Sequence, residues 1–186
     1  MAACAALLVG CGGAAPRPAT PSAATRAAVT RAEGHERARR HDLARAEYER
    51  AIADAPDRAS EIYARLELAS QLAFWGEVAG AIDQLEQVLA LDPSIARAWH
   101  DLGILRHHAG DDAGARAALE RAVTLAPEDP RPRIALAALL WQGGDAAAAR
   151  AQYQALLALD LPDAVRDKVT WAIGAIDAQQ AAGGTP

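Results

Sequence analysis

The stretch of sequence that decides the fold is residues 96–129, ARAWHDLGILRHHAGDDAGARAALERAVTLAPED. Its central glycine, Gly110, lies 34 residues from both Gly76 and Gly144. Columns of alanine, of leucine or tyrosine, and of proline keep the same step. They are Ala81, Ala115 and Ala149; Leu68, Leu102 and Leu136; Leu85, Leu119 and Tyr153; and Pro93 and Pro127. Several columns that share one period indicate an array of repeated structural units.

Composition predicts that these units are helical. The chain of 186 residues contains 50 alanines and is 52% hydrophobic but only 4% aromatic. Alanine is the best helix former, whereas β-sandwiches and barrels need β-branched and aromatic residues. A formal net charge of −5 disfavours a nucleic-acid binder. No apolar run reaches the roughly 18 residues of a transmembrane helix.

Each unit is expected to hold two antiparallel helices. The repeated glycines end the first helix, because glycine adopts a left-handed cap without strain. Asp111 and Asp145 follow two of these glycines and are suited to cap the second helix. Proline then stops that helix. The alanine columns allow two helices to approach to about 8–10 Å.

The best unit carries Trp99, Leu102, Gly103, Gly110 and Pro127 at set places, a pattern that resembles the tetratricopeptide repeat (TPR). The resemblance implies an all-α fold, a right-handed α-solenoid of antiparallel helix pairs over residues 25–182. The units are 62–95, 96–129 and 130–163, preceded by a degenerate copy at about 25–58.

The two ends of the array have their own signals. In the degenerate copy Arg31 and Ala32 replace the usual Leu-Gly, so we expect it to be helical but less well packed. After the last unit, residues 163–180 form an amphipathic helix that is expected to cap the array. The residues expected to cover the exposed core are Val169, Ala172, Ile173 and Ile176.

The N-terminus predicts a lipid anchor. Residues 1–10 form a short apolar run that reads as a signal peptide, and Leu8-Val9-Gly10-Cys11 resembles the lipobox of bacterial lipoproteins. The resemblance implies lipidation of Cys11, a flexible linker over 11–24, and a place on the periplasmic face of the outer membrane. No Lys or Arg precedes Cys11, although secretory signals begin with positive charge. Either Met1 is internal to a longer reading frame, or the protein is cytoplasmic with an alanine-rich tail.

By the family pattern, the first helix of each unit lines a concave groove that binds a peptide or helix. The candidate partner-binding residues are Tyr63, Leu66, Phe74, Arg97, His100, His107, His108, Arg131 and Trp141. Aromatic and arginine side chains of this kind carry most of the energy at protein interfaces. The alternative for Phe74 and Trp141 is that they pack between helices.

The sequence offers no basis for catalysis or a cofactor. His100, His107 and His108 are not spaced three or four residues apart, which is what two metal ligands on one helix require, so we expect no metal site. No catalytic triad or phosphate-binding loop is recognisable. We therefore expect a non-enzymatic scaffold or assembly factor with a protein or peptide partner. The alternatives are a soluble cytoplasmic adaptor and a regulatory subunit of an enzyme on another chain.

Overall fold

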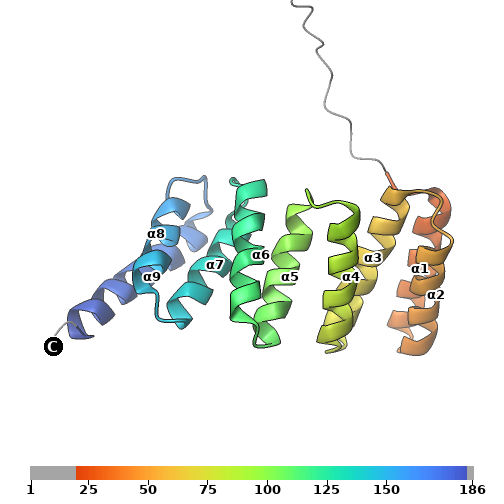
Figure 1. Cartoon of the computed structure of the whole chain (residues 1–186), viewed down its shortest axis with the longest axis horizontal. Helices are drawn as coiled ribbons and strands as arrows, with labels where there is room; N and C mark the ends of the chain where they lie inside the picture. The colour runs from red at the N-terminus through yellow and green to blue at the C-terminus, as the bar shows by residue number, and fades with distance from the viewer. Residues whose placement is uncertain (1–19, 184–186) are drawn as a thin grey trace, which may run out of the picture.

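A computed structural model describes residues 20–183 as an array of α-helices (Figure 1). The predicted signal peptide 1–10, Cys11 and most of the predicted linker lie outside this range. The described residues form nine helices: α1 (Ala23–Arg37), α2 (His41–Ala53), α3 (Arg58–Phe74), α4 (Val78–Leu91), α5 (Ala96–His108), α6 (Asp112–Leu125), α7 (Pro130–Gln142), α8 (Ala146–Leu156) and α9 (Asp163–Gly183). None of them is long and apolar enough to cross a membrane.

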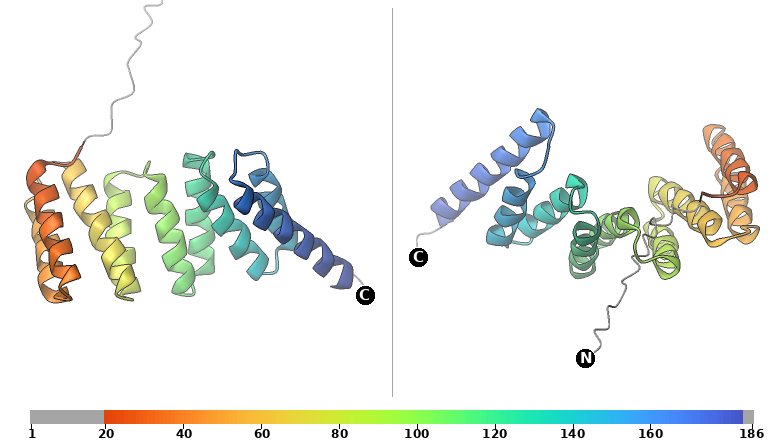
Figure 2. Two further views of the ribbon diagram at one scale, coloured as in Figure 1. Left: turned by 180° about the vertical axis from the view of Figure 1, so that it is seen from behind. Right: turned by 90° about the horizontal axis from the view of Figure 1, so that it is seen from above.

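Consecutive helices pack as pairs, α1 with α2, α3 with α4, α5 with α6, and α7 with α8. The pairs lie side by side along the array (Figure 1). Seen from above, α1, α3, α5 and α7 line one side and α2, α4, α6 and α8 the other, and the two ends bend toward the first side (Figure 2). The predicted all-α solenoid is confirmed, and its concave face belongs to the first helix of each pair.

The repeated glycines make the turns between paired helices. Gly76, Gly110 and Gly144 have φ angles of +80°, +83° and +84°, in the left-handed region where a Cβ atom is strained. The following residue then donates its N–H back across the turn; Asp111 N, for example, lies 2.9 Å from the carbonyl oxygen of Arg106. This pattern satisfies carbonyl groups that the end of the helix leaves free.

Aspartates start two of the second helices, α6 and α8, as predicted. The carboxylate of Asp111 accepts a hydrogen bond from Gly114 N at 2.9 Å, and that of Asp145 accepts one from Ala148 N at 3.1 Å. We expect Asp145→Ala to lower the free energy of unfolding by about 1 kcal/mol, because Ala148 N loses its acceptor. Chemical denaturation measures this change. Asp145→Asn is the control, since asparagine caps equally well, and an equal loss in both variants would assign the effect to charge.

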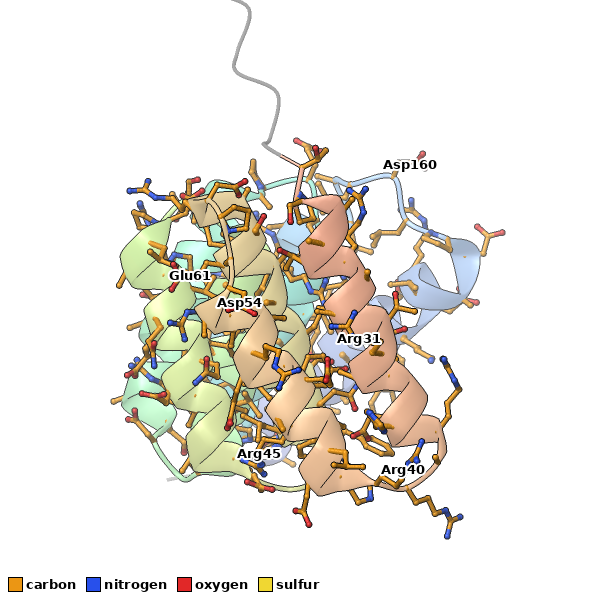
Figure 3. The ribbon with its side chains drawn as sticks, turned by 90° about the vertical axis from the view of Figure 1, so that its right-hand side faces the viewer. Arg31, Arg40, Arg45, Asp54, Glu61 and Asp160 are labelled. Carbon is orange, nitrogen blue, oxygen red and sulfur yellow. The ribbon has the colours of Figure 1, made fainter. Side chains whose placement is uncertain are left out.

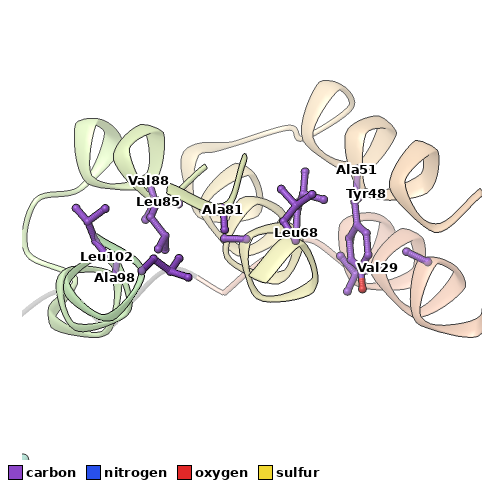
Figure 4. Close-up of a cluster of buried hydrophobic side chains, with 14 of the residues drawn as sticks. Val29, Tyr48, Ala51, Leu68, Ala81, Leu85, Val88, Ala98 and Leu102 are labelled. Atoms are coloured by element: carbon purple, nitrogen blue, oxygen red, sulfur yellow. The ribbon is translucent and has the colours of Figure 1, made fainter. Parts of the chain in front are cut away.

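Small residues bring the paired helices together. Ala81, Ala115 and Ala149 are each 0% exposed, and the large residue one turn later in the same helix is also buried. Leu119, for example, lies beneath Gly103 at the crossing of α5 and α6. The buried side chains form two clusters along the array, one from α1 to α6 and one from α6 to α9, and Figure 4 shows part of the first.

The first pair is as fully packed as the others, contrary to our expectation. Val29, Ala32 and Tyr48 are all 0% exposed. The buried face of α1 does not include Arg31, which lies at the outer end of the array (Figure 3). Arg31 pairs with Glu47 of α2 at 3.0 Å. The side chain of Arg31, which departs from the family pattern, therefore faces solvent, and Tyr48 fills the space between α1 and α2.

The C-terminal helix α9 caps the array, as predicted. It packs against α8 and buries Val169, Ala172 and Ile176, while Ile173 is half-buried. Without α9, the apolar face of the last pair would meet water, which repeat arrays avoid by a terminal capping element. The helix runs to Gly183.

Candidate partner-binding groove

A groove of about 650 Å³ lies on the concave face, where α3 and α5 meet, and Arg131 of α7 borders it. Helical spacing of three or four residues places its lining residues on the same face of each helix. They are Leu66, Ala69, Ser70, Ala73, Leu85, Arg97, His100, Asp101, Ile104, Leu105 and Arg131. The set combines aliphatic side chains with two arginines, one histidine and one aspartate. A surface of this kind suits an amphipathic segment of polypeptide.

The two arginines of the groove remain open to solvent although each has an acidic neighbour. The Arg97 side chain is 56% exposed, and its Nε lies 3.4 Å from Asp101 Oδ2. The Arg131 side chain is 67% exposed and donates to both carboxylate oxygens of Asp129. Its hydrogen bonds lower the pKa of the Asp129 carboxyl. Both guanidinium groups therefore keep free N–H donors, because each has five.

His100 completes the polar part of the groove. Its Nδ1 lies 2.9 Å from Asp101 Oδ1, which orients the ring. Ser70 lines the same groove, so serine, histidine and aspartate occur together here. Among residues 20–183, however, the Ser70 hydroxyl makes no hydrogen bond with His100. The walls are helices whose backbone N–H groups are already bonded internally, so they leave no pair of donors for an oxyanion.

Four of the nine predicted partner-binding residues line this groove: Leu66, Arg97, His100 and Arg131. Tyr63 lies one turn before Leu66 on α3 and packs partly against the core. Phe74, at the end of α3, is 82% exposed and stands apart from the groove. Of these residues, only Phe74 presents a large apolar side chain almost wholly to solvent.

His107, His108 and Trp141 lie outside the groove lining. His107 Nδ1 lies 2.6 Å from Asp112 Oδ1, and His108 is exposed beside it. Trp141 turns toward the capping helix. Its Nε1 donates to Gln179 Oε1 at 2.9 Å, and its ring centre is 6.4 Å from that of Trp171. Within the described part of the chain no three side chains are grouped so as to hold a metal ion.

The candidate set from the sequence omitted seven of the lining residues, which are Ala69, Ser70, Ala73, Leu85, Asp101, Ile104 and Leu105. Asp101 follows Arg97 by four residues on α5, the spacing at which opposite charges meet on a helix. That spacing could have identified it. Leu105 is 8% exposed and belongs to the core as much as to the groove. Its contribution becomes visible only when α3 and α5 are placed side by side.

Comparisons with known proteins agree with this architecture. Residues 75–130 match the family described as tetratricopeptide repeat. No curated protein sequence matches the chain. Among solved structures, MamA is similar with a TM-score of 0.72 and 18% identity, covering 84% of this chain and 82% of MamA. Pseudomonas aeruginosa PilF gives a TM-score of 0.63 and 18% identity, covering 84% of this chain and 74% of PilF.

A third solved structure contains a bound peptide. It is the Yersinia enterocolitica type III secretion chaperone SycD in complex with a peptide of the translocator YopD. The TM-score is 0.58 at 22% identity, covering 62% of this chain and 92% of SycD. At this identity the likeness concerns the fold. The family match over residues 75–130 and the solenoid of paired helices together show that this chain has a tetratricopeptide repeat fold.

Proposed function

We propose that this protein is a non-catalytic protein–protein interaction module that binds a peptide or helix in its concave groove. The observation that carries the proposal is the groove itself, in which aliphatic side chains of α3 and α5 lie beside the exposed guanidinium groups of Arg97 and Arg131. A partner segment would bury apolar residues against Leu66 and Ile104. The two arginines would donate hydrogen bonds to carboxylate or carbonyl oxygens of that segment.

The size and chemistry of the groove favour a polypeptide over a small metabolite. Its residues come from two repeats with Arg131 from a third, so the surface extends along the array. Amphipathic helices dock in such grooves through side chains spaced by three, four and seven residues. The SycD structure, which contains a peptide, adds support from a protein of similar fold.

The proposal is tested by selecting peptides from a random library displayed on phage against the full chain. Selected peptides are then titrated against the Arg97→Ala, Arg131→Ala double variant. We expect their dissociation constants to rise at least tenfold, because buried contacts of arginine are common hot spots at interfaces. Tenfold corresponds to about 1.4 kcal/mol. Fluorescence anisotropy of labelled peptides measures the change.

Arg121→Ala provides the matched control, since Arg121 is an exposed arginine of α6, a helix of the opposite layer. It should leave peptide affinity unchanged. Circular dichroism should show the same helical content in all three proteins, because these side chains face solvent. Peptides that bind the double variant at full strength would place the binding surface elsewhere and refute the proposal.

The envelope location is a further part of the proposal. We infer from the lipobox-like Leu8–Cys11 segment that the protein is anchored by lipid at Cys11, on the periplasmic face of the outer membrane, and acts there as a scaffold or assembly factor. The same groove would serve a soluble cytoplasmic adaptor or a regulatory subunit. The chemical state of Cys11 separates the anchored protein from both alternatives.

A further inference from the structure

The turn between α1 and α2 lies beside the turn between α3 and α4, at the lower edge of the array in Figure 1. Side chains join the two turns. Trp75 Nε1 donates to Glu36 Oε2 at 3.0 Å, and the centre of the His41 ring lies 5.2 Å from that of the Trp75 ring. The guanidinium carbon of Arg45 lies 5.4 Å from the centre of the same indole. Trp75 therefore holds the two turns in a fixed relation.

The edge exposes cationic and apolar side chains together, and we call it the basic–aromatic edge. It consists of Arg37, Arg39, Arg40, Leu43 and Phe74. Phe74 is 82% exposed and Leu43 is 49% exposed. None of the three arginines forms an ion pair within residues 20–183. One exposed acid, Asp42, lies in the same stretch, so the edge keeps a net positive charge.

The backbone of Arg39 is strained to keep an arginine at this edge. Its φ angle is +56°, and the corresponding residues of the later turns are Gly76, Gly110 and Gly144. The hydrogen bonds of the turn are the same, since Arg40 N lies 2.9 Å from the carbonyl oxygen of His35. Glycine would adopt this conformation without strain. Strain of this kind is found where a side chain serves a function other than folding.

The combination of groups selects the surface of a bilayer with anionic lipids. Lipid phosphates would receive hydrogen bonds from the arginines, and the hydrocarbon boundary would take up Phe74 and Leu43. A bare anion would leave both apolar side chains in water. An uncharged apolar surface would leave the arginines without a counter-ion. Figure 3 shows Arg40 at the outer margin of the array, where a broad surface can reach it.

The length of chain that precedes the array is compatible with such a contact. Helix α1 has 15 residues and runs from the opposite edge to this one, a distance of about 22 Å. The segment from Cys11 to Ser22 spans up to about 36 Å when extended. A lipid carried by Cys11 can therefore reach the plane of the basic–aromatic edge.

We propose that the basic–aromatic edge docks the array on the surface of a membrane that contains anionic lipids. The helices of the first two pairs then stand on the membrane, and the concave groove opens sideways toward a partner. The corresponding turn between α5 and α6 contains Asp111 and Asp112, so the contact is confined to the N-terminal part of the array. The docking surface is separate from the groove, whose lining includes none of its residues.

The test measures binding to vesicles. The full chain with Cys11→Ser, which has no lipid-bearing thiol at this position, is sedimented with vesicles of phosphatidylcholine that contain one quarter phosphatidylglycerol. We expect binding that weakens as salt is raised, because salt screens the arginines. Vesicles of phosphatidylcholine alone should bind much less. Binding by this edge is weak and reversible, so dilution during cell fractionation releases a protein without a lipid anchor.

Variants identify the residues that make the contact. The Arg37→Gln, Arg40→Gln double variant should bind anionic vesicles at least tenfold more weakly, since each arginine near an anionic surface contributes to affinity. The Arg121→Gln, Lys168→Gln double variant is the matched control. It removes the same charge from exposed positions in α6 and α9 and should change the affinity less than twofold.

Arg39→Gly separates docking from folding. The melting temperature should rise, because glycine relieves the positive φ angle, while binding to anionic vesicles should weaken severalfold. Phe74→Ser should also weaken binding, and its melting temperature should stay unchanged because the ring is exposed. Calorimetry and sedimentation measure the two quantities on the same samples.

Several results would overturn the docking edge. They are equal binding to vesicles without phosphatidylglycerol, an equal loss in the control double variant, and an Arg39→Gly protein that binds at full strength. Peptides selected against the groove should bind the Arg37→Gln, Arg40→Gln variant with unchanged affinity. The docking edge and the proposed groove can therefore fail independently.

Discussion

Gly103→Ala is expected to lower the melting temperature, although alanine normally favours a helix over glycine. Gly103 lies in α5, and a Cβ atom at this position would be 2.6 Å from Leu119 Cγ and 3.2 Å from the carbonyl oxygen of Ala115. Leu119 is 1% exposed and cannot move away without displacing its neighbours. Overpacking of this kind costs about 1–3 kcal/mol. For a chain of this size the loss corresponds to roughly 2–12 °C, measurable by calorimetry.

The capping helix supplies the opposite case for comparison. A Cβ atom at Gly174 in α9 would have nothing within 4 Å. Gly174→Ala should therefore stabilise the protein by about 0.5–1 kcal/mol, the ordinary helix preference of alanine. A Gly103→Ala variant that is also stabilised would mean that α5 and α6 are further apart than the structure shows. The sign of the difference between these two substitutions tests the close approach of the helices directly.

Cys11→Ser is expected to move the protein from the membrane fraction to the soluble fraction of bacterial cells. If the resemblance to the lipobox is correct, the Cys11 thiol carries the acyl chains that hold the protein at the membrane. Each buried CH₂ group of such a chain contributes about 0.8 kcal/mol, so a lipid anchor dominates membrane affinity. Cell fractionation followed by immunoblotting measures the redistribution. Mass spectrometry should find an acylated Cys11 at the N-terminus of the unaltered protein.

Cys4→Ser is the control for this experiment, because Cys4 lies inside the predicted signal peptide and is not the lipobox cysteine. This variant should remain in the membrane fraction. A Cys11→Ser protein that stays at the membrane, or an unaltered protein that retains Met1, would contradict the lipid anchor. That result would favour the soluble adaptor, and the proposal for the groove would be unaffected.

The sequence alone was sufficient for the architecture, because a repeat imposes the same local solution several times. Gly110 must lack a Cβ atom so that its backbone can adopt a left-handed φ angle. Ala115 must have a small side chain so that two helices can cross there. These demands recur every 34 residues, so they stand out from the background as columns. Part of the groove follows from them too, since Arg97 and Arg131 occupy the same place in successive units and both border it.

The tertiary structure decided what depends on contacts between units. Trp141 occupies a groove place by the repeat pattern, yet it hydrogen-bonds to Gln179, because the helix after the last unit is a cap rather than another repeat. The first pair is well packed although Arg31 breaks the pattern, since Arg31 lies off the buried face of α1 and pairs with Glu47 of α2. Residues that are 34 positions apart share an environment only when the units beside them are alike. At both ends of this array the neighbouring units differ, because one end has no further unit and the other has the capping helix.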